Sequence, residues 1–402
     1  MSLIDKKIID SITKRGVEEI IIEAEFVKLL ELNKPLRLKM GFDPSSSDIH
    51  IGHAVGLKKM RQLQNLGHKC VLIIGDWTAR IGDPTGVSAT RKMLSQSEVE
   101  SNAKTYLEQF FKIVDIDQTE VVYQSEWYGD FRLENIIELT SKFTVAQFLA
   151  REDFNNRYKQ GKPIAITEFL YPLLQAYDSV AINSDVEFGG IDQKFNLLIG
   201  RQLQSMNGMK PQQCLMVPLL VGTDGSNKMS KSLNNYIGIA EKPEDIYGKI
   251  MSIPDNLIIN YLELLSEFST DEINQMTQAM NLGNENPMNF KKELAKDIVS
   301  QFHTKQDAIN SEANFQLVIQ NNEIPENLES HNLTDIINNK LSTILVQTSM
   351  AKSNSEAKRL INQGAIEING VKITKDTQMN SLKQGDIFKI GKQKYFQVYQ
   401  KT

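Results

Sequence analysis

The chain has 402 residues, which is too long for one ordinary hydrophobic core and predicts two or three domains. Its 41% hydrophobic and 24% charged residues are typical of a soluble globular protein, and its two cysteines exclude a disulfide framework or a zinc site built from cysteine alone. No apolar run approaches the ~20 residues that a membrane helix needs. The first residues, MSLIDKKIID, lack the apolar core and cleavage site of a signal peptide. These features predict a cytoplasmic protein with no membrane partner.

The net charge of −5 conceals an uneven distribution along the chain. Residues 341–402 contain ten Lys/Arg and four Asp/Glu, a net charge of +6, so the preceding 340 residues carry −11. A basic tail on an acidic body indicates that the tail contacts a polyanion. The alternative is a solvated surface that is merely basic, and charge alone does not decide between the two.

The N-terminal part of the chain predicts alternating helices and strands. Residues 1–35 are predicted to be helical, with a break at 33–35. The run 36–42 (LRLKMGF) predicts a strand, and 54–66 (AVGLKKMRQLQNL) predicts a helix with apolar residues at every third position. The apolar, partly β-branched run 69–76 (KCVLIIGD) is typical of a buried parallel strand. This strand–helix–strand unit predicts an α/β nucleotide-binding fold with a doubly wound parallel sheet.

The predicted secondary structure changes twice further along the chain. Alternation continues less clearly to about residue 222, and helical patterns dominate from 225 to 320. Residues 321–338 are largely polar and include Pro325, which predicts a linker. In the remainder, 339–402, the helical stretch SEAKRLINQ precedes short β-like runs separated by glycine turns, so we expect a small α+β domain.

The stretch 42–53, FDPSSSDIHIGH, places two of the chain's five histidines at the mouth of the predicted helix. As metal ligands, His50 and His53 would need partners, and the other histidines form no spaced cluster with a cysteine or carboxylate. A second interpretation is structural, with the histidines capping the helix. A third is a phosphate site, because a helix N-terminus offers unpaired N–H groups and imidazoles add directed donors. Gly52 would then allow a close approach to the backbone.

A second motif lies far downstream. Residues 228–232 read KMSKS within the Gly-rich stretch VGTDGSNKMSKSLNN. Two lysines and two serines on a flexible loop can wrap a triphosphate, although such a loop alone is more often only a solvent-exposed loop. In combination with His-Ile-Gly-His after the first strand, the motif is specific. On these two signatures the sequence resembles the class I aminoacyl-tRNA synthetases.

The two motifs suit the chemistry that this resemblance implies. Amino-acid activation is the attack of an already ionised carboxylate on the α-phosphorus of ATP, so it requires no catalytic triad or general base. The enzyme must hold the reacting groups in line and stabilise the charge that develops on the phosphates. Histidine and lysine donors can do this. The other common solution, a Gly-x-x-x-x-Gly-Lys-Ser/Thr loop, is absent from the sequence.

Three further stretches indicate tyrosine as the amino acid. LYPLLQAYD places Tyr171, Gln175 and Asp178 on one helix face, and an ordinary core face would not combine glutamine with aspartate. GGIDQKFN (189–196) and IGDPTG (81–86) add further polar residues in turns. In order and content these stretches resemble the bacterial tyrosyl-tRNA synthetases, from the first strand to the C-terminus.

The resemblance implies a role for each matching residue on the amino-acid side. Asp83, Tyr171 and Gln175 would hold the substrate ammonium. Asp178 would accept a hydrogen bond from the phenol hydroxyl. Gln193 would orient the substrate carboxylate at the phosphate.

The resemblance likewise implies the ATP-binding residues. His50 and His53 would bind the phosphates as catalytic residues. Lys228 and Lys231 would close over them, and Asp192 would hold the ribose. The remaining expected ATP contacts are Gly41, Asp43, Gly52, Gly190, Met229 and Ser230. ATP would be a substrate accompanied by Mg²⁺, without a dedicated protein metal site.

One position departs from the family pattern. Many members carry a tyrosine two residues before the glycine of the strand-end Gly-Phe-Asp, where it contacts the substrate phenol, and this chain has Lys39 there. We include Lys39 among the tyrosine-binding residues and hypothesise that it keeps Asp178 ionised, by pairing or through water. The alternative is that Lys39 extends to solvent at the strand edge. This departure and the intact KMSKS sequence suggest a distinct bacterial branch.

The implied function is that of a tyrosine–tRNA ligase, which converts L-tyrosine and ATP to tyrosyl-adenylate and diphosphate and then transfers the tyrosyl group to the 3′ end of tRNA(Tyr). Residues 1–224 would form the catalytic domain, with an insertion near 115–190 at which the family forms homodimers. Residues 225–320 would hold the KMSKS loop and the anticodon-side helices. After the linker, 339–402 would form an S4-like RNA-binding domain.

Three alternatives stay open at this point. A tryptophanyl enzyme is the nearest relative in fold, although Gln175, Asp178 and the S4-like tail argue against it. A nucleotidylyltransferase with no tRNA partner shares the His-x-Gly-His pattern but would not need the long helical and basic appendage. A non-catalytic RNA-binding protein on a decayed synthetase scaffold would not need intact histidine and lysine motifs.

Overall fold

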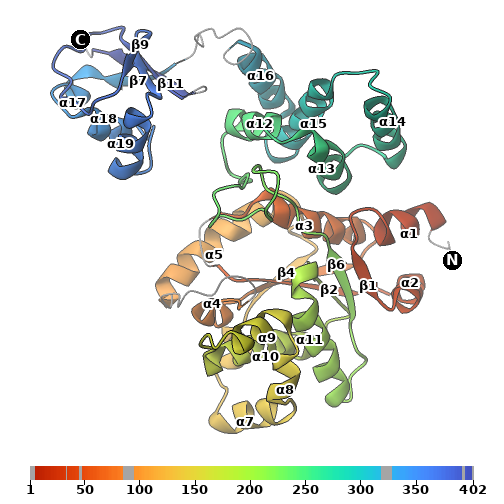
Figure 1. The fold of residues 1–402 in the computed structure, drawn as a ribbon. Helices are drawn as coiled ribbons and strands as arrows, with labels where there is room; N and C mark the ends of the chain where they lie inside the picture. Colours follow the sequence, from red (N-terminus) through yellow and green to blue (C-terminus); the bar gives the residue numbers. More distant parts are fainter. Residues whose placement is uncertain are drawn as a thin grey trace. The chain divides into compact units, whose positions relative to one another are not determined.

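The computed structural model describes residues 5–32, 34–44, 48–84, 95–317, 328–391 and 394–400. The chain forms two compact units, Met1–Lys305 and Gln306–Thr402, whose elements are labelled in Figure 1. Some residues discussed in the sequence analysis lie outside the described ranges. They are residue 33 of the expected helix break, residues 45–47 of FDPSSSDIHIGH, residues 85–86 of IGDPTG and residues 321–327 of the predicted linker.

The first unit is built around a six-stranded sheet with the strand order β1-β6-β5-β2-β3-β4. Its strands are β1 (Glu19–Ile21), β2 (Arg37–Phe42), β3 (Lys69–Ile74), β4 (Thr119–Tyr123), β5 (Val186–Gly190) and β6 (Gln213–Val217). Strands β2 to β6 are parallel, and β1 is antiparallel to β6. The predicted parallel α/β fold is therefore confirmed.

The prediction of an entirely helical N-terminal segment is wrong at β1. Helices α1 (Lys6–Thr13) and α2 (Glu23–Glu31) are present, but the residues between them include a strand that pairs with Cys214–Met216 of β6. The hydrogen-bond partners of this short strand come from β6, which lies far downstream in the sequence. Strand formation here depends on that tertiary pairing, which no local pattern reveals.

Helices cover both faces of the sheet (Figure 1). Helices α3 (Ile51–Gln64) and α5 (Gln96–Phe110) lie on one face, and α10 (Ile166–Ala181) and α11 (Lys194–Met206) lie on the other. Because both faces are covered, strands β3 and β6 are almost continuously apolar. The shorter helices of this part are α4 (Thr78–Ile81), α6 (Ser125–Tyr128), α7 (Leu133–Ser141), α8 (Val145–Leu149), α9 (Glu152–Lys159) and the 3-10 helix η1 (Ile191–Gln193).

The strand order reverses between β2 and β5. The chain moves outward from β2 to β3 and β4, and then returns across β2 to form β5 and β6. In open parallel sheets, ligands bind at the carboxyl ends of the strands beside such a reversal. The start of α3 follows β2 and η1 follows β5, so their first residues lie at this edge.

A group of helices follows the sheet within the first unit. Its members are α12 (Pro243–Met251), the 3-10 helix η2 (Asp255–Leu257), α13 (Ile258–Leu265), α14 (Thr270–Asn281) and α15 (Pro287–Phe302). Proline begins α12 and α15, where its missing N–H costs no helix hydrogen bond. The helical character predicted for this part of the sequence is thus present. Among all described residues, no helix combines the length and apolarity needed to cross a lipid bilayer.

The second unit contains a five-stranded sheet with the order β7-β11-β10-β8-β9. Its strands are β7 (Glu329–Asn332), β8 (Ile366–Ile368), β9 (Val371–Ile373), β10 (Ile387–Ile390) and β11 (Lys394–Tyr399). Its helices are α17 (Leu333–Ile336), α18 (Leu341–Gln347) and α19 (Asn354–Asn362), preceded by α16 (Lys305–Phe315). The helix and strands predicted for the end of the chain are present.

The predicted linker 321–338 is too long. Within it, β7 pairs in parallel with β11, and α17 follows directly. The segment is polar because β7 lies at the sheet edge, and its partner strand is the last one in the chain. A polar composition therefore did not distinguish this edge strand from a linker.

Candidate active site

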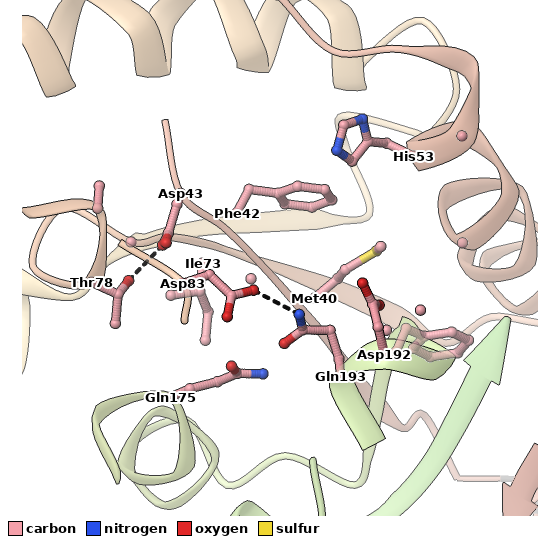
Figure 2. Close-up of a pocket in the computed structure, with 18 of the residues that line it drawn as sticks. Met40, Phe42, Asp43, His53, Ile73, Thr78, Asp83, Gln175, Asp192 and Gln193 are labelled. Carbon is pink, nitrogen blue, oxygen red and sulfur yellow. Dashed lines mark hydrogen bonds between the residues drawn. The ribbon is translucent and has the colours of Figure 1, made fainter. Parts of the chain in front are cut away.

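A cavity of about 780 Å³ lies at the carboxyl edge of the six-stranded sheet, beside the reversal between β2 and β5 (Figure 2). Most of the residues expected to bind tyrosine or ATP line it. They are Gly41, Asp43, His50, Gly52, His53, Asp83, Tyr171, Gln175, Asp178, Gly190, Asp192, Gln193, Lys228, Met229, Ser230 and Lys231. The exception is Lys39, which is not among the described residues that line the cavity. The fold thus gathers residues from distant parts of the sequence into one chamber.

The two histidines stand together at the start of α3. The backbone N–H of His50 donates to Nδ1 of His53 at 3.2 Å, and the ring centroids lie 3.9 Å apart. Burial, reinforced by the neighbouring His53 and lysine charges, lowers the pKa of His50 to about 2. Burial, reinforced by the charge of Lys231, lowers the pKa of His53 to about 4. Both rings are therefore neutral near pH 7. Because Nδ1 of His53 accepts a hydrogen bond, its proton lies on Nε2, which is a directed donor.

Two glycines shape this part of the cavity. A Cβ atom at position 52 would lie 2.9 Å from Nδ1 of His50, so only glycine leaves room for the imidazole in its observed position. At Gly41, near the end of β2, an added Cβ would meet no described atom within 4 Å. This glycine lines the cavity, and its lack of a side chain leaves space for a ligand.

The lysines of the KMSKS loop also line the cavity. Nζ of Lys228 lies 3.0 Å from Oδ2 of Asp192. Nζ of Lys231 donates to the hydroxyl of Tyr106 at 3.2 Å and lies 5.2 Å from its ring centroid. Burial lowers the pKa of Lys231 to about 8, so this lysine is mainly cationic at neutral pH. The loop can therefore present positive charge to phosphates.

A buried asparagine holds the KMSKS loop in shape. Oδ1 of Asn235 accepts from the backbone N–H of Ser230 at 2.8 Å. Its Nδ2 donates to the carbonyl of Lys228 at 3.1 Å and to Oδ2 of Asp224 at 3.0 Å. Sequence reasoning did not single out Asn235 or Asp224. Their positions on either side of KMSKS were the available signal.

Asp43 bonds to two other residues that line the cavity, Tyr171 and Thr78, and Figure 2 shows the bond to Thr78. The hydroxyl of Tyr171 donates to its Oδ2 at 2.9 Å, and Oγ1 of Thr78 donates to its Oδ1 at 2.6 Å. Burial raises the pKa of Tyr171 well above its usual value, so this side chain is a neutral donor. Tyr171 was expected on the ammonium side and Asp43 on the nucleotide side. The structure places the two in direct contact, where these regions meet.

A row of amides and carboxylates forms another wall. Nε2 of Gln193 donates to Oδ2 of Asp83 at 2.7 Å, as drawn in Figure 2. Nδ2 of the buried Asn196 donates to Oε1 of Gln193 at 2.8 Å and to Oε1 of Gln175 at 3.1 Å. Three residues expected to contact the amino acid are thus fixed relative to one another. Asn196, which connects them, was not identified from the sequence.

Asp178 is a buried carboxylate at the cavity wall, with 2% of its surface exposed. Oδ2 accepts from Nε2 of Gln124 at 2.8 Å, and Oδ1 accepts from Nε1 of Trp127 at 3.2 Å. Burial raises the pKa of Asp178 to about 7, and the charge of Lys39 and these two donors oppose that rise. Sequence reasoning missed Gln124 and Trp127, although they directly follow β4, whose carboxyl end meets the same sheet edge.

The hypothesis that Lys39 pairs with Asp178 is wrong, and so is the alternative that Lys39 extends to solvent. Its side chain is fully buried, and Nζ lies 2.8 Å from Oε1 of Glu187 on the adjacent strand. The same Nζ donates to the carbonyl of Gln175 at 2.7 Å and to Oγ of Ser179 at 2.6 Å. Lys39 therefore lies behind the cavity wall and influences Asp178 only through its charge.

The cavity combines two chemical environments. One is a buried carboxylate acceptor with fixed neighbours, which suits a hydroxyl group on an enclosed ligand. The other is a pair of neutral histidines facing two lysines, which suits the phosphates of a nucleotide. No group of three or more His, Cys, Asp or Glu residues in the described part of the chain could hold a metal ion.

Comparisons with known proteins agree with this arrangement. A family model described as tRNA synthetases class I (W and Y) matches residues 31–320, and one described as Tyrosine--tRNA ligase SYY-like C-terminal domain matches residues 321–398. A Tyrosine--tRNA ligase from Dehalococcoides mccartyi (strain CBDB1) is 58% identical over 387 residues, which cover 96% of this chain and 97% of that relative. One from Carboxydothermus hydrogenoformans is 48% identical and covers 96% of both chains.

Solved structures show the same fold at lower identity. The tyrosyl-tRNA synthetase of Archaeoglobus fulgidus, complexed with L-tyrosine, superposes with a TM-score of 0.61 at 23% identity, over 76% of this chain and 98% of that one. A C-terminally truncated mitochondrial tyrosyl-tRNA synthetase of Aspergillus nidulans gives a TM-score of 0.65 at 19% identity, over 78% and 94%. The extent and identity of the curated matches decide the family: the chain belongs to the tyrosine–tRNA ligases among the class I aminoacyl-tRNA synthetases.

Proposed function

We propose that this enzyme joins L-tyrosine to ATP in the cavity and then transfers the tyrosyl group to the 3′ end of tRNA(Tyr). One observation carries the proposal: a single cavity contains both the buried acceptor Asp178 and the histidines and lysines suited to phosphates. Tyrosine requires the first and ATP requires the second. Family membership supports the same reaction.

In the activation step the tyrosine carboxylate attacks the α-phosphorus of ATP, the bond to the diphosphate breaks, and tyrosyl-adenylate forms. His53 donates from Nε2, while Lys228 and Lys231 supply positive charge. These groups stabilise charge that develops on the phosphate oxygens, and the rigid cavity holds the reactants in line. The neutral histidines need no change of protonation during this step.

Recognition of tyrosine is assigned to the opposite wall. The phenol hydroxyl donates to Asp178, and Asp83, Tyr171 and Gln175 surround the ammonium. Gln193 orients the carboxylate. Phenylalanine would leave Asp178 without a ligand partner, and an unsatisfied buried acceptor disfavours binding.

The ATP ribose is assigned to Asp192, beside the glycines of β5. Mg²⁺ accompanies ATP as part of that substrate, because phosphate oxygens are ligands that Mg²⁺ prefers. The described residues supply no three-ligand cluster of their own, and no step above depends on the ion.

The C-terminal domain is assigned to tRNA. Its last 62 residues, 341–402, carry a net charge of +6, which suits a phosphate backbone. We place the catalytic domain in 1–224 and the helical anticodon-side domain in 225–320. The second compact unit, with β7 as its first strand, would then act as the S4-like tRNA-binding module.

We further propose a cytoplasmic homodimer whose interface lies within 115–190. Several large apolar side chains of α7, α8 and α10 are exposed there: Leu133 (74%), Ile137 (59%), Val145 (62%) and Ile166 (80%). Exposed apolar groups of this kind favour a protein–protein interface. The expected partner is a second copy of the chain.

Pyrophosphate exchange into ATP tests the proposed activation reaction. It is measured separately with tyrosine, with tryptophan and with no amino acid, and is followed by aminoacylation of tRNA(Tyr). We expect exchange that depends on tyrosine alone. Exchange driven by tryptophan, or without any amino acid, would refute the proposal.

A further inference from the structure

Lys39 and Glu187 form a buried ion pair behind the tyrosine end of the cavity. They are register partners on the adjacent parallel strands β2 and β5, so their side chains emerge on the same face of the sheet. Their side chains are 0% and 2% exposed, and Nζ lies 2.8 Å from Oε1. The backbone therefore imposes this pairing, and the two charges neutralise each other in a dry environment.

Stability alone does not explain such a pair. Removing two charges from water is costly, and apolar residues of similar volume are often equally or more stabilising at buried positions. The neighbouring strand positions here are apolar, so an apolar solution was available to the fold. The residues that contact the two charges therefore indicate why a charged pair is present.

Some of those contacts lead to Gln175, which lines the cavity, and others lead to the buried Ser179 and Gln212, whose side chains donate to Oε2 of Glu187. Lys39 donates to the backbone carbonyl of Gln175 at 2.7 Å. Oε1 of Glu187 accepts from the side-chain Nε2 of the same glutamine at 3.2 Å. The ion pair thus forms two hydrogen bonds with Gln175, one to its backbone carbonyl oxygen and one from its side-chain Nε2. With Nε2 held by Glu187, Oε1 of Gln175 points toward Asn196.

The connection continues beyond Gln175. Asn196, which is 1% exposed, donates both to Gln175 and to Oε1 of Gln193. Gln193 in turn donates to Asp83 at 2.7 Å. A continuous row of hydrogen bonds, here called the amide row, therefore links the ion pair to three side chains assigned to tyrosine.

We propose that Lys39 and Glu187 are positioning residues that orient Gln175, and through the amide row Gln193 and Asp83, for binding tyrosine. This inference rests on the proposed function, because it concerns the same substrate. Neither residue touches the substrate. Their effect passes through the amide orientations, each of which fixes whether an oxygen or an N–H group faces the ligand. The phosphate-binding histidines and lysines lie outside the row.

The pair therefore affects the two substrates differently. Removing both charges frees the Gln175 amide and raises the KM for tyrosine about tenfold, which corresponds to about 1.4 kcal/mol. The KM for ATP stays within twofold. A single replacement leaves one charge buried without its partner and destabilises the fold as well. The double replacement leaves no unpaired charge, although the buried Ser179 hydroxyl and Gln212 amide lose their acceptor on Glu187. Thermal unfolding is therefore measured beside the KM values, which separates a loss of stability from a loss of positioning.

The test compares wild type with Lys39→Met/Glu187→Met, using tyrosine-dependent pyrophosphate exchange together with thermal unfolding. The control is Lys291→Met/Asp255→Asn, which removes a more exposed lysine–carboxylate pair of the first unit, 2.6 Å apart and outside the cavity lining. We expect a tenfold rise in the tyrosine KM only in the first variant. A tyrosine KM within twofold of wild type would overturn the inference.

A second variant keeps the inference testable if the double replacement does not fold. Asn196→Leu interrupts the amide row and leaves the ion pair intact, so it too should raise the tyrosine KM and spare the ATP KM. Equal changes in both KM values would mean a general structural role and would also refute the inference. A wild-type enzyme that shows no tyrosine-dependent exchange would instead refute the proposed function.

Discussion

Asp178→Asn is the replacement that most directly tests how the enzyme distinguishes tyrosine from phenylalanine. Asp178 offers two oxygens: Oδ2 accepts from Gln124, and Oδ1 accepts from Trp127 and, at 3.4 Å, from the hydroxyl of Tyr128. An asparagine has nearly the same size but only one oxygen. Its amide N–H₂ group must therefore face one of these donors or the phenol hydroxyl of tyrosine. In each arrangement a buried polar group loses its proper partner.

The expected magnitude follows from that loss. A hydrogen bond to a charged group contributes about 1.5 to 3 kcal/mol, and each 1.4 kcal/mol is tenfold in a rate or binding ratio. Asp178→Asn should therefore reduce the ratio of kcat/KM for tyrosine to that for phenylalanine by about 10- to 100-fold. Phenylalanine has no hydroxyl to lose, so its own kcat/KM should change much less.

The pKa of Asp178 adds a second, independent expectation. Burial raises this pKa to about 7, so the carboxyl group is largely neutral below pH 7 and ionised above it. A neutral carboxyl group discriminates less, so the wild-type Tyr/Phe ratio should rise from pH 6 to pH 8. Because kcat/KM reports the free enzyme, it should follow this pKa. The asparagine variant cannot ionise at this position and should show a flat ratio.

Pyrophosphate exchange with each amino acid, measured from pH 6 to pH 8, supplies both readouts. Asn235→Ala, which loosens the KMSKS loop without contacting Asp178, is the control and should lower both activities together. The reasoning fails if Asp178→Asn keeps the wild-type Tyr/Phe ratio. It also fails if the wild-type ratio is independent of pH.

Three other outcomes follow from the proposed assignments. His53→Ala should lower the single-turnover rate of adenylate formation by ~100-fold, the scale of one lost charge-stabilising donor, with little change in tyrosine affinity; loss of tyrosine binding with an unchanged rate would contradict the role of His53. A chain that ends at residue 317 should still form tyrosyl-adenylate but lose aminoacylation and part of the salt dependence of tRNA binding; if this chain folds but makes no adenylate, the division between domains is wrong. Ile137→Glu should convert a dimer to a monomer in light scattering after size-exclusion chromatography, and an unchanged mass would exclude Ile137 from the interface.

Local patterns were sufficient for the central strands and the first crossover helix. Most of the run LRLKMGF forms β2, and KCVLII forms β3, because both runs are short and mainly apolar and are buried under helices on both faces. The strands β1 and β7 were missed for a shared reason. Each lies at the edge of its sheet and pairs with a strand that is distant in sequence. Local composition carries little information about such pairings.

The candidate site divides in a similar way. Residues in motifs, such as His53 and Lys231, could be predicted to lie in one cavity because their motifs resemble those of a known family. Residues that support them, such as Gln124 and Asn196, are ordinary amides whose importance depends on what they contact. An amide at a strand end is common, and only the assembled fold shows which one faces a buried carboxylate. The cavity was therefore predictable and its supporting hydrogen bonds were not.

Lys39 illustrates what the sequence could still have revealed. It interrupts the apolar strand run LRLKMGF, and Glu187 interrupts the run VEFGG, with the opposite charge. A lysine or a glutamate in the centre of a covered parallel strand is tolerated only with a partner. Two such exceptions of opposite sign in one sheet predict that the two strands are neighbours and in register. The observed pairing of Lys39 with Glu187 satisfies that requirement. Because Lys39 pairs with Glu187, no cationic side chain among the described residues contacts Asp178 directly. Asp178 accepts from the neutral side chains of Gln124 and Trp127, which allow its carboxyl group to take up a proton.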